Sequence, residues 1–353
     1  MRIGVDATPA ISGVTGVARY TLALLDGLPR AGVEVSSFAI GRGPGSLPAG
    51  TRHLRVPLRV VHRAWQLGVP LRAEHLCGRV DVVHSTDLVL PPTRLPSVAT
   101  VHDVSAVEIP DLHSARIVRL TAARLASLRR ATVVVANSQA SADALSRVVD
   151  IASLVVVPLA PCPLPDPGDG PPVVSGDYVL CVGEVAERKD HVTLVRAFAE
   201  ADLGPTRLVI AGPAGSGSAL LAAEIERLGL AERVLVLGRV DDLTLARLYA
   251  GARAMCLASR QEGFCLPLVE AMQRDLPIVV TDLPVTREVT AGAAVLVAAR
   301  DVDGFARSLE RVVSDEDLRK TLIDASRRRA DAFSPERMVQ GTVAAYERAL
   351  AIS

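Results

Sequence analysis

Short apolar runs alternate with helical patterns along almost the whole chain of 353 residues. Runs rich in Val, Ile, Leu and Ala are each long enough for one strand, and segments with apolar residues at helical spacing separate them. Such alternation is typical of parallel sheets covered by helices. In the first half we expect strands at 2–6, 33–40, 51–56, 81–84, 97–101, 132–136 and 154–158, and helices at 16–30, 59–75, 114–130 and 138–147.

A proline-rich segment interrupts this alternation. Residues 161–172 read P-C-P-L-P-D-P-G-D-G-P-P, and six prolines among twelve residues cannot continue a helix or a sheet. The alternation then restarts, with strands expected at 178–183, 206–211, 233–237, 254–258, 277–281 and 293–297, and helices at 191–202, 218–229, 242–251 and 267–274. Ser334-Pro335 marks the start of a final helix, with Ser as N-cap and Pro in the first turn.

The predicted fold is therefore α/β, with two doubly wound, Rossmann-like domains. We expect a first domain at 1–160, a stiff linker at 161–176, a second domain at 177–333 and a C-terminal helix at 334–353 that packs back toward the first domain. Folds of this kind bind ligands beyond the carboxyl ends of their strands, so a site is expected in a cleft between the two domains.

Composition narrows the class of protein. The chain has 39 Lys and Arg against 39 Asp and Glu, a balance that argues against a nucleic-acid partner. Its five cysteines are odd in number and lack metal-ligand spacing, which favours reduced thiols in a cytoplasmic protein. The chain opens directly on a strand, without a signal peptide, and no run reaches the roughly 18 apolar residues of a membrane span. The sequence indicates no oligomeric state.

The segment Ser259–Met272 carries two carboxylates around an expected turn and helix start. Glu262 precedes Gly263, whose backbone can approach a ligand closely, and Glu270 lies about one turn into the helix expected to start at Pro267. Two carboxylates beside the free N–H groups of a helix start can bind the hydroxyls of a sugar. Taken alone, each Glu is equally typical of a solvated loop or of a helix face.

Three further segments carry polar groups at predicted strand ends. Residues 183–190, G-E-V-A-E-R-K-D, place Arg188 and Lys189 after a strand, where they can neutralise a diphosphate or lie on the surface. Residues 12–20 carry Gly13 and Gly16 between a strand and a helix, a plain turn or a phosphate loop. His102 ends an apolar strand; His84 and Asn137-Ser138 end neighbouring ones and are expected at the rim of the same site.

Together these motifs resemble the retaining glycosyltransferases of family 4, which have the two-domain GT-B fold. E-G-F-C-L-P-L-V-E, residues 262–270, is similar to the E-x7-E motif of that family, and E-R-K at 187–189 is similar to the corresponding loop of mannosyltransferase-like members. The resemblance implies a retaining hexosyltransferase with a nucleotide-diphosphate sugar as donor, GDP-mannose before UDP-sugars. The acceptor would be a hydroxyl of a glycan, a lipid-linked sugar or a small molecule. No cofactor is implied and, without a D-x-D motif, no metal.

The resemblance also assigns roles to residues. Glu262 and His102 would contact the transferred sugar, Arg188 and Lys189 the diphosphate, and Glu270 the ribose. The remaining donor contacts would come from Gly13, Gly16, Gly183, Gly263, Phe264, Cys265, Leu266, Gly238, Arg239 and Val240. Cys265 stands where the family usually has Gly, and Glu184 where relatives often have Arg. These departures keep open a GT-B-like sugar-nucleotide epimerase and a non-catalytic sugar-nucleotide-binding protein.

Residues 52–72 are strongly basic, with five arginines, no acid and a single Trp65. A basic amphipathic helix can lie on an anionic membrane. The same segment could bind an anionic acceptor, or it could be a solvated face packed on its own sheet. If it contacts lipid, the protein works at the inner face of a membrane.

Overall fold

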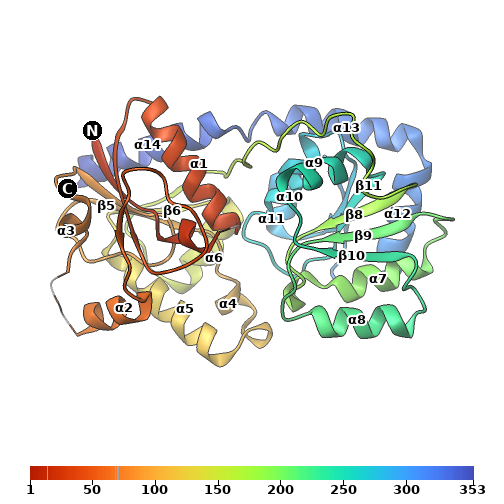
Figure 1. Ribbon diagram of the computed structural model, residues 1–353, viewed down its shortest axis with the longest axis horizontal. Helices are drawn as coiled ribbons and strands as arrows, with labels where there is room; N and C mark the ends of the chain where they lie inside the picture. Colours follow the sequence, from red (N-terminus) through yellow and green to blue (C-terminus); the bar gives the residue numbers. More distant parts are fainter. Residues whose placement is uncertain (14, 68, 70) are drawn as a thin grey trace. The chain divides into compact units, whose positions relative to one another are not determined.

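The computed structural model describes residues 1–13, 15–67, 69 and 71–353 (Figure 1). Val14 of the predicted glycine loop, and Gly68 and Pro70 of the predicted helix 59–75, lie outside the described residues. The chain forms two compact units. Unit 1 comprises Met1–Cys162 and Phe333–Ser353, and unit 2 comprises Pro163–Ala332.

Unit 1 is built on a seven-stranded parallel sheet in the order β3-β2-β1-β4-β5-β6-β7. Its four central strands are buried along nearly their whole length, as expected for a sheet covered on both faces. The strands are β1 Arg2–Asp6, β2 Glu34–Ile40, β3 Arg52–Leu54, β4 Val82–Ser85, β5 Ser97–Val101, β6 Val133–Ala136 and β7 Leu154–Val156. The helices are η1 Thr8–Ser12, α1 Gly16–Arg30, α2 Leu58–Gln66, α3 Ala73–Cys77, α4 Ser105–Glu108, η2 Pro110–Leu112, α5 Ala115–Ser127, η3 Leu128–Arg130, α6 Gln139–Val148 and α14 Pro335–Ile352.

The C-terminal helix α14 belongs to unit 1, although 170 residues of unit 2 precede it in the chain. Ser334 caps it by accepting a hydrogen bond from the backbone N–H of Arg337 at 3.2 Å. The helix lies beside α1 (Figure 1). Gly27 of α1 permits this approach, because a Cβ there would lie 2.5 Å from a methyl group of Val339.

Unit 2 is built on a six-stranded parallel sheet in the order β10-β9-β8-β11-β12-β13. Helices α7 and α8 lie on one face and α9 and α10 on the other (Figure 1). The strands are β8 Tyr178–Val182, β9 Arg207–Ala211, β10 Val234–Gly238, β11 Ala254–Leu257, β12 Ile278–Thr281 and β13 Val295–Val297. The helices are η4 Glu187–Lys189, α7 His191–Glu200, α8 Ser218–Arg227, α9 Asp242–Gly251, α10 Leu266–Met272, α11 Pro284–Thr290, α12 Val302–Ser314 and α13 Glu316–Ala330. Two parallel-sheet, Rossmann-like domains are confirmed.

The basic segment of unit 1 differs from the sequence prediction. The helix expected at 59–75 is two helices, α2 and α3, because a proline at position 70 disfavours helical backbone at the preceding residue. The proline-rich segment packs on unit 2, where Nε of Arg247 donates to the carbonyl of Pro167 at 2.9 Å.

Candidate functional site

Two of the predicted motifs lie on loops that leave neighbouring strands of unit 2. Loop 183–190 follows β8 and contains η4, and loop 258–265 follows β11. Since β8 and β11 pair in parallel, their carboxyl ends lie at the same edge of the sheet. The backbone N–H of Arg260 donates to the carbonyl of Arg188 at 2.8 Å and joins the two loops directly.

A buried ion cluster also joins these loops. Nζ of Lys189 donates to Oε1 of Glu262, and Nη1 of Arg188 lies 3.7 Å from Oε2 of the same carboxylate. The side chains of Glu262 and Lys189 are only 5% and 11% exposed. Three of the four residues predicted to be catalytic therefore lie in contact within unit 2.

The charges of this cluster stabilise one another. Burial by itself would raise the pKa of the Glu262 carboxyl, but the charges of Lys189 and Arg188 and the hydrogen bond from Lys189 outweigh it and lower that pKa. Burial would lower the pKa of Lys189, whereas the carboxylate of Glu262 raises it above its ordinary value. Both side chains are thus charged at neutral pH, and the cluster offers two cations and one carboxylate to a ligand.

Cys265 has a left-handed backbone, with φ 71° and ψ 65°, directly before α10. The helix begins at Leu266, one residue before the predicted start, so Pro267 is its second residue. Proline fits there because N–H groups of the first turn have no acceptor within the helix. Cys265 is 6% exposed, and burial raises the pKa of its thiol. It is therefore a neutral, packed side chain.

Glu270, the second carboxylate of the motif, has a different environment. It lies on α10, is 6% exposed, and its Oε2 accepts a hydrogen bond of 2.7 Å from the hydroxyl of Tyr249 on α9. Burial and then the neighbouring carboxylate raise the pKa of Tyr249, so the phenol keeps its proton and donates to Glu270. No local motif in the sequence indicates this partner.

The other residues predicted to contact the donor are spread along the same edge of the sheet. A Cβ at Gly183 would lie 3.9 Å from Nζ of Lys189, so this glycine borders the ion cluster. Gly263 and Phe264 lie between Glu262 and Cys265, and the side chain of Phe264 is buried. Gly238 ends the edge strand β10, and Arg239 and Val240 follow it; this strand is two strands away from β8, and the three residues lie outside the ion cluster.

In unit 1, His102 directly follows β5 and is held by two groups. Its Nε2–H donates to the carbonyl of Thr86 at 2.9 Å, and its ring meets that of Tyr20 edge-on, with 4.8 Å between centroids. Burial lowers the pKa of His102. The neutral imidazole therefore carries its lone pair on Nδ1. Gly13 ends η1 and Gly16 begins α1, the helix that carries Tyr20.

The prediction that His84 lies at the rim of the site is wrong. Strand β4 extends to Ser85, so His84 lies inside the strand and is fully buried. Its Nδ1 and Nε2 bond to the hydroxyls of Tyr346 at 2.7 Å and Thr100 at 2.8 Å. Burial lowers its pKa to about 3. Asn137, in contrast, does support the site, because its Nδ2 donates to the backbone carbonyl of His102 at 2.8 Å.

Within the basic segment 52–72, Trp65 packs inward. It lies against the apolar cluster that includes Phe38 and Val61, and its indole N–H donates to the carbonyl of Leu71 at 2.8 Å. Trp65 therefore cannot serve as a lipid-facing anchor. The exposed apolar residues of the segment are Val60, Leu67 and Val69.

One buried residue beside the ion cluster was not predicted. His191, the first residue of α7, is 4% exposed, and its Nδ1 makes no hydrogen bond within the described residues. Burial, and then the charge of Lys189, lower its pKa to about 4. His191 is therefore neutral at pH 7, and its place directly after the predicted basic loop was the available signal.

Among the residues that the structure describes, no three His, Cys, Asp or Glu side chains are grouped so that they could hold a metal ion. Within the same ranges, no helix has both the length and the apolar character needed to cross a membrane.

Each half of the chain matches the model of a known protein family. The family model described as Glycosyl transferases group 1 matches residues 171–329, and the model described as Glycosyltransferase Family 4 matches residues 14–160. O-antigen chain mannosyltransferase B of Escherichia coli is 27% identical over 98% of this chain and 100% of its own length. An MMP alpha-(1->4)-mannosyltransferase of Mycolicibacterium hassiacum is 37% identical, over 36% of this chain and 32% of its own.

Solved structures share the fold across both units. Sucrose-phosphate synthase from Thermosynechococcus elongatus aligns over 100% of both chains, with a TM-score of 0.79 and 20% identity. HepE from Anabaena, solved in complex with UDP and glucose, aligns over 97% of this chain and 98% of its own, with a TM-score of 0.72 and 19% identity.

Proposed function

The chain belongs to glycosyltransferase family 4, with the GT-B fold and mannosyltransferase relatives, and we propose that it moves a hexose with retained configuration from a nucleotide-diphosphate sugar to an acceptor hydroxyl. The ion cluster of Glu262, Lys189 and Arg188 carries this proposal. Two cations at the carboxyl ends of adjacent parallel strands match the charge of a diphosphate. A carboxylate beside them can accept hydrogen bonds from sugar hydroxyls.

The cluster also suggests how the donor is bound. Before binding, Glu262 neutralises Lys189 and Arg188 and keeps both in place. An incoming diphosphate would compete for the two cations and leave the Glu262 carboxylate to the hexose. As the bond from the anomeric carbon to the diphosphate breaks, negative charge grows on the leaving group, and the fixed cations stabilise it. The acceptor hydroxyl arrives on the same face, so the configuration is retained.

Glu270 and His102 complete the proposed set of contacts. We assign the ribose hydroxyls to Glu270, whose second oxygen Tyr249 already holds. His102 of unit 1 would contact the transferred sugar through the lone pair on Nδ1, because Nε2–H is engaged by Thr86. A mannose donor, with GDP before UDP, is favoured because mannosyltransferases are among the relatives and because the E-R-K loop is present. No metal is proposed.

Lys189 can be tested with a matched control, because the chain has only one other lysine, the exposed Lys320. We expect Lys189→Met and Glu262→Gln each to lower the rate of transfer from the donor by at least about 100-fold, the scale of losing one fixed group that stabilises transition-state charge. Lys320→Met should transfer at the wild-type rate. Full activity of Lys189→Met would contradict the role of this cation.

The product distinguishes the remaining alternatives. Proton NMR of the product should give the same anomeric configuration as the donor. Incubation without acceptor should leave the hexose of the donor unchanged apart from slow hydrolysis, whereas an epimerase would convert it. Donor binding with neither hexose transfer nor conversion, across a panel of acceptors, would identify a non-catalytic sugar-nucleotide-binding protein.

We also propose peripheral membrane contact through the outer face of the basic segment. This face carries the exposed apolar residues Val60 and Leu67 beside the exposed Arg59 and Arg63, a combination suited to anionic lipid. In co-sedimentation, wild-type protein should bind vesicles that contain anionic lipid, and Arg59→Glu/Arg63→Glu should bind at least tenfold less. Equal sedimentation with neutral vesicles would overturn the proposal.

A further inference from the structure

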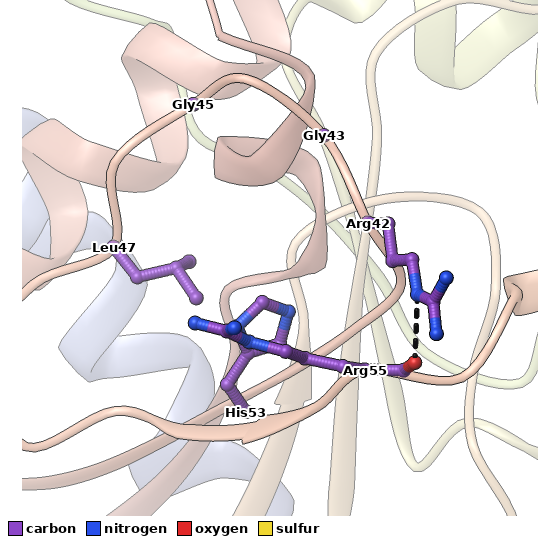
Figure 2. Close-up of a pocket in the computed structure, with 6 residues that line it drawn as sticks. All are labelled: Arg42, Gly43, Gly45, Leu47, His53 and Arg55. Carbon is purple, nitrogen blue, oxygen red and sulfur yellow. Dashed lines mark hydrogen bonds between the residues drawn. The ribbon is translucent and has the colours of Figure 1, made fainter.

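Unit 1 contains a cavity of about 520 Å³ that none of the predicted donor-site residues lines, although two of its lining residues, His53 and Arg55, belong to the basic segment 52–72. Its walls are a loop that follows β2 and a short stretch that includes the end of β3. Figure 2 shows the loop arching from Arg42 to Leu47 over His53 and Arg55. The size of the cavity lies in the range of small-molecule sites.

Two glycines fix the shape of this cavity. A Cβ on Gly43 would lie 2.3 Å from the carbonyl oxygen of Ile11, and a Cβ on Gly45 would lie 2.0 Å from that of Ala10. The backbone N–H of Gly45 also donates to the carbonyl of Ile11 at 2.9 Å. The arching loop therefore packs backbone to backbone on η1, and only glycine permits this approach.

The cavity is cationic. Of the described residues that line it, none is acidic and two are arginines, Arg42 and Arg55. Nε of Arg42 donates to the carbonyl of Arg55 at 3.1 Å, the hydrogen bond drawn as a dashed line in Figure 2. Neither arginine forms an ion pair within the described ranges. Two uncompensated guanidinium groups thus border one hollow.

The position in the fold is that of a ligand site. β2 and β3 are parallel, with Ile40 paired to Leu54, so Arg42 and Arg55 both leave the sheet at its carboxyl edge. The arching loop also borders the predicted glycine loop, because a Cβ on Gly45 would lie 2.8 Å from the backbone N of Gly13.

We propose that Arg42 and Arg55 bind a phosphate group carried by the acceptor, within the cavity between loop 42–47 and β3. The planar fork of arginine matches phosphate oxygens, and two guanidinium groups without an acid match a dianion. A cavity of about 520 Å³ holds a phosphorylated hexose. The inference rests on the proposed function, since it identifies the chemical class of the acceptor.

Binding of a neutral hexose and of its phosphorylated counterparts tests the proposed phosphate site without a transfer reaction. We would titrate the full-length protein by calorimetry, with and without nucleoside diphosphate, using a hexose, the same hexose 6-phosphate and a short-chain prenyl diphosphate hexose. The variants are Arg42→Gln, Arg55→Gln and, as control, Arg129→Gln, which removes an exposed arginine of unit 1 that does not line the cavity. Thermal melting checks that each variant is folded.

We expect at least one phosphorylated probe to bind at least tenfold more tightly than the neutral hexose. Arg42→Gln and Arg55→Gln should each remove about tenfold of this preference, and Arg129→Gln none. Tighter binding of the prenyl probe would identify a lipid-linked acceptor, and tighter binding of the 6-phosphate a free sugar phosphate. No phosphate-dependent binding, or equal losses in the control, would overturn the inference. Nucleoside diphosphate should bind all of these samples equally, and a Lys189→Met sample measured beside them should lose that binding, so this failure remains distinct from failure of the proposed function.

Discussion

At the scale of single residues, Cys265 holds a backbone conformation that favours glycine. An L-residue in the left-handed region costs about 1–2 kcal/mol, a cost that glycine avoids. Its tight burial leaves little room for the backbone to relax. Cys265 therefore has a backbone conformation that is strained for any residue except glycine, and its side chain is packed in the core.

Two substitutions at this position separate strain from packing. Cys265→Ala and Cys265→Gly both remove the sulfur, but only glycine relieves the backbone. We expect the glycine variant to be more stable than the alanine variant by about 1 kcal/mol, after allowance for the greater entropy of unfolded glycine. Urea unfolding of the two variants measures the difference. An alanine variant equal to or more stable than glycine would show that the backbone relaxes.

At the scale of elements, the ion pair of Lys189 and Glu262 ties the loop after β8 to the loop after β11. Removing one partner of a buried pair costs about 3–5 kcal/mol when the other charge is left alone, and here Lys189→Met leaves Glu262 only the more distant Arg188; replacing both partners by uncharged groups of similar shape is close to neutral. Lys189→Met should therefore destabilise unit 2 by about 3 kcal/mol. Lys189→Met/Glu262→Gln should recover most of this loss in urea unfolding but remain inactive in transfer. Equal stabilities of the single and double variants would contradict mutual compensation.

The sequence predicted most elements of both sheets, because buried parallel strands are short continuous apolar runs. β1, β5 and α1 have the predicted ends. Helices α12 and α13 were not predicted, although Asp301 and Asp315 cap them. The sequence of α13 is so polar that apolar residues do not recur at helical spacing, and an N-cap residue alone does not predict a helix.

The site was less predictable than the elements. Glu262, Arg188 and Lys189 were each identifiable from local motifs, but their contact depends on β8 and β11 being neighbours in the sheet. Lys189 and Glu262 are 73 positions apart in the chain, and strand order is a property of the whole domain. For the same reason, the hydrogen bond from Tyr249 to Glu270 could not be foreseen from either helix alone.

At the scale of the whole molecule, each unit contains a buried neutral histidine whose protonation affects the stability of that unit in acid. In unit 1, burial lowers the pKa of His84 to about 3, but burial also raises the pKa of Asp6 to about 6. As pH falls below 6.5, His84 binds a proton in the unfolded chain but stays neutral in the folded protein, which destabilises unit 1. Asp6 binds a proton at higher pH in the folded protein than in the unfolded chain, which stabilises unit 1. The two effects on the stability of unit 1 have opposite signs.

In unit 2, the buried histidine with a lowered pKa is His191. Its folded pKa of about 4 lies below the ordinary 6.5, so its contribution to stability is complete above pH 6.5 and is lost as pH falls toward 4. The loss at pH 5 is about 2 kcal/mol. The depressed pKa of Glu262 adds its own loss only below the ordinary carboxyl range, so the loss from His191 comes first as the pH falls from 8 to 5.

Hydrogen exchange, corrected for the intrinsic effect of pH, measures the pH-dependent loss of stability of each unit separately. A single melting curve would mix the two domains. Peptides from β8 and β11 should lose about 2 kcal/mol of protection between pH 8 and pH 5 in the wild type, and His191→Gln should remove most of that loss. An unchanged loss in His191→Gln would move the acid sensitivity of unit 2 to other groups.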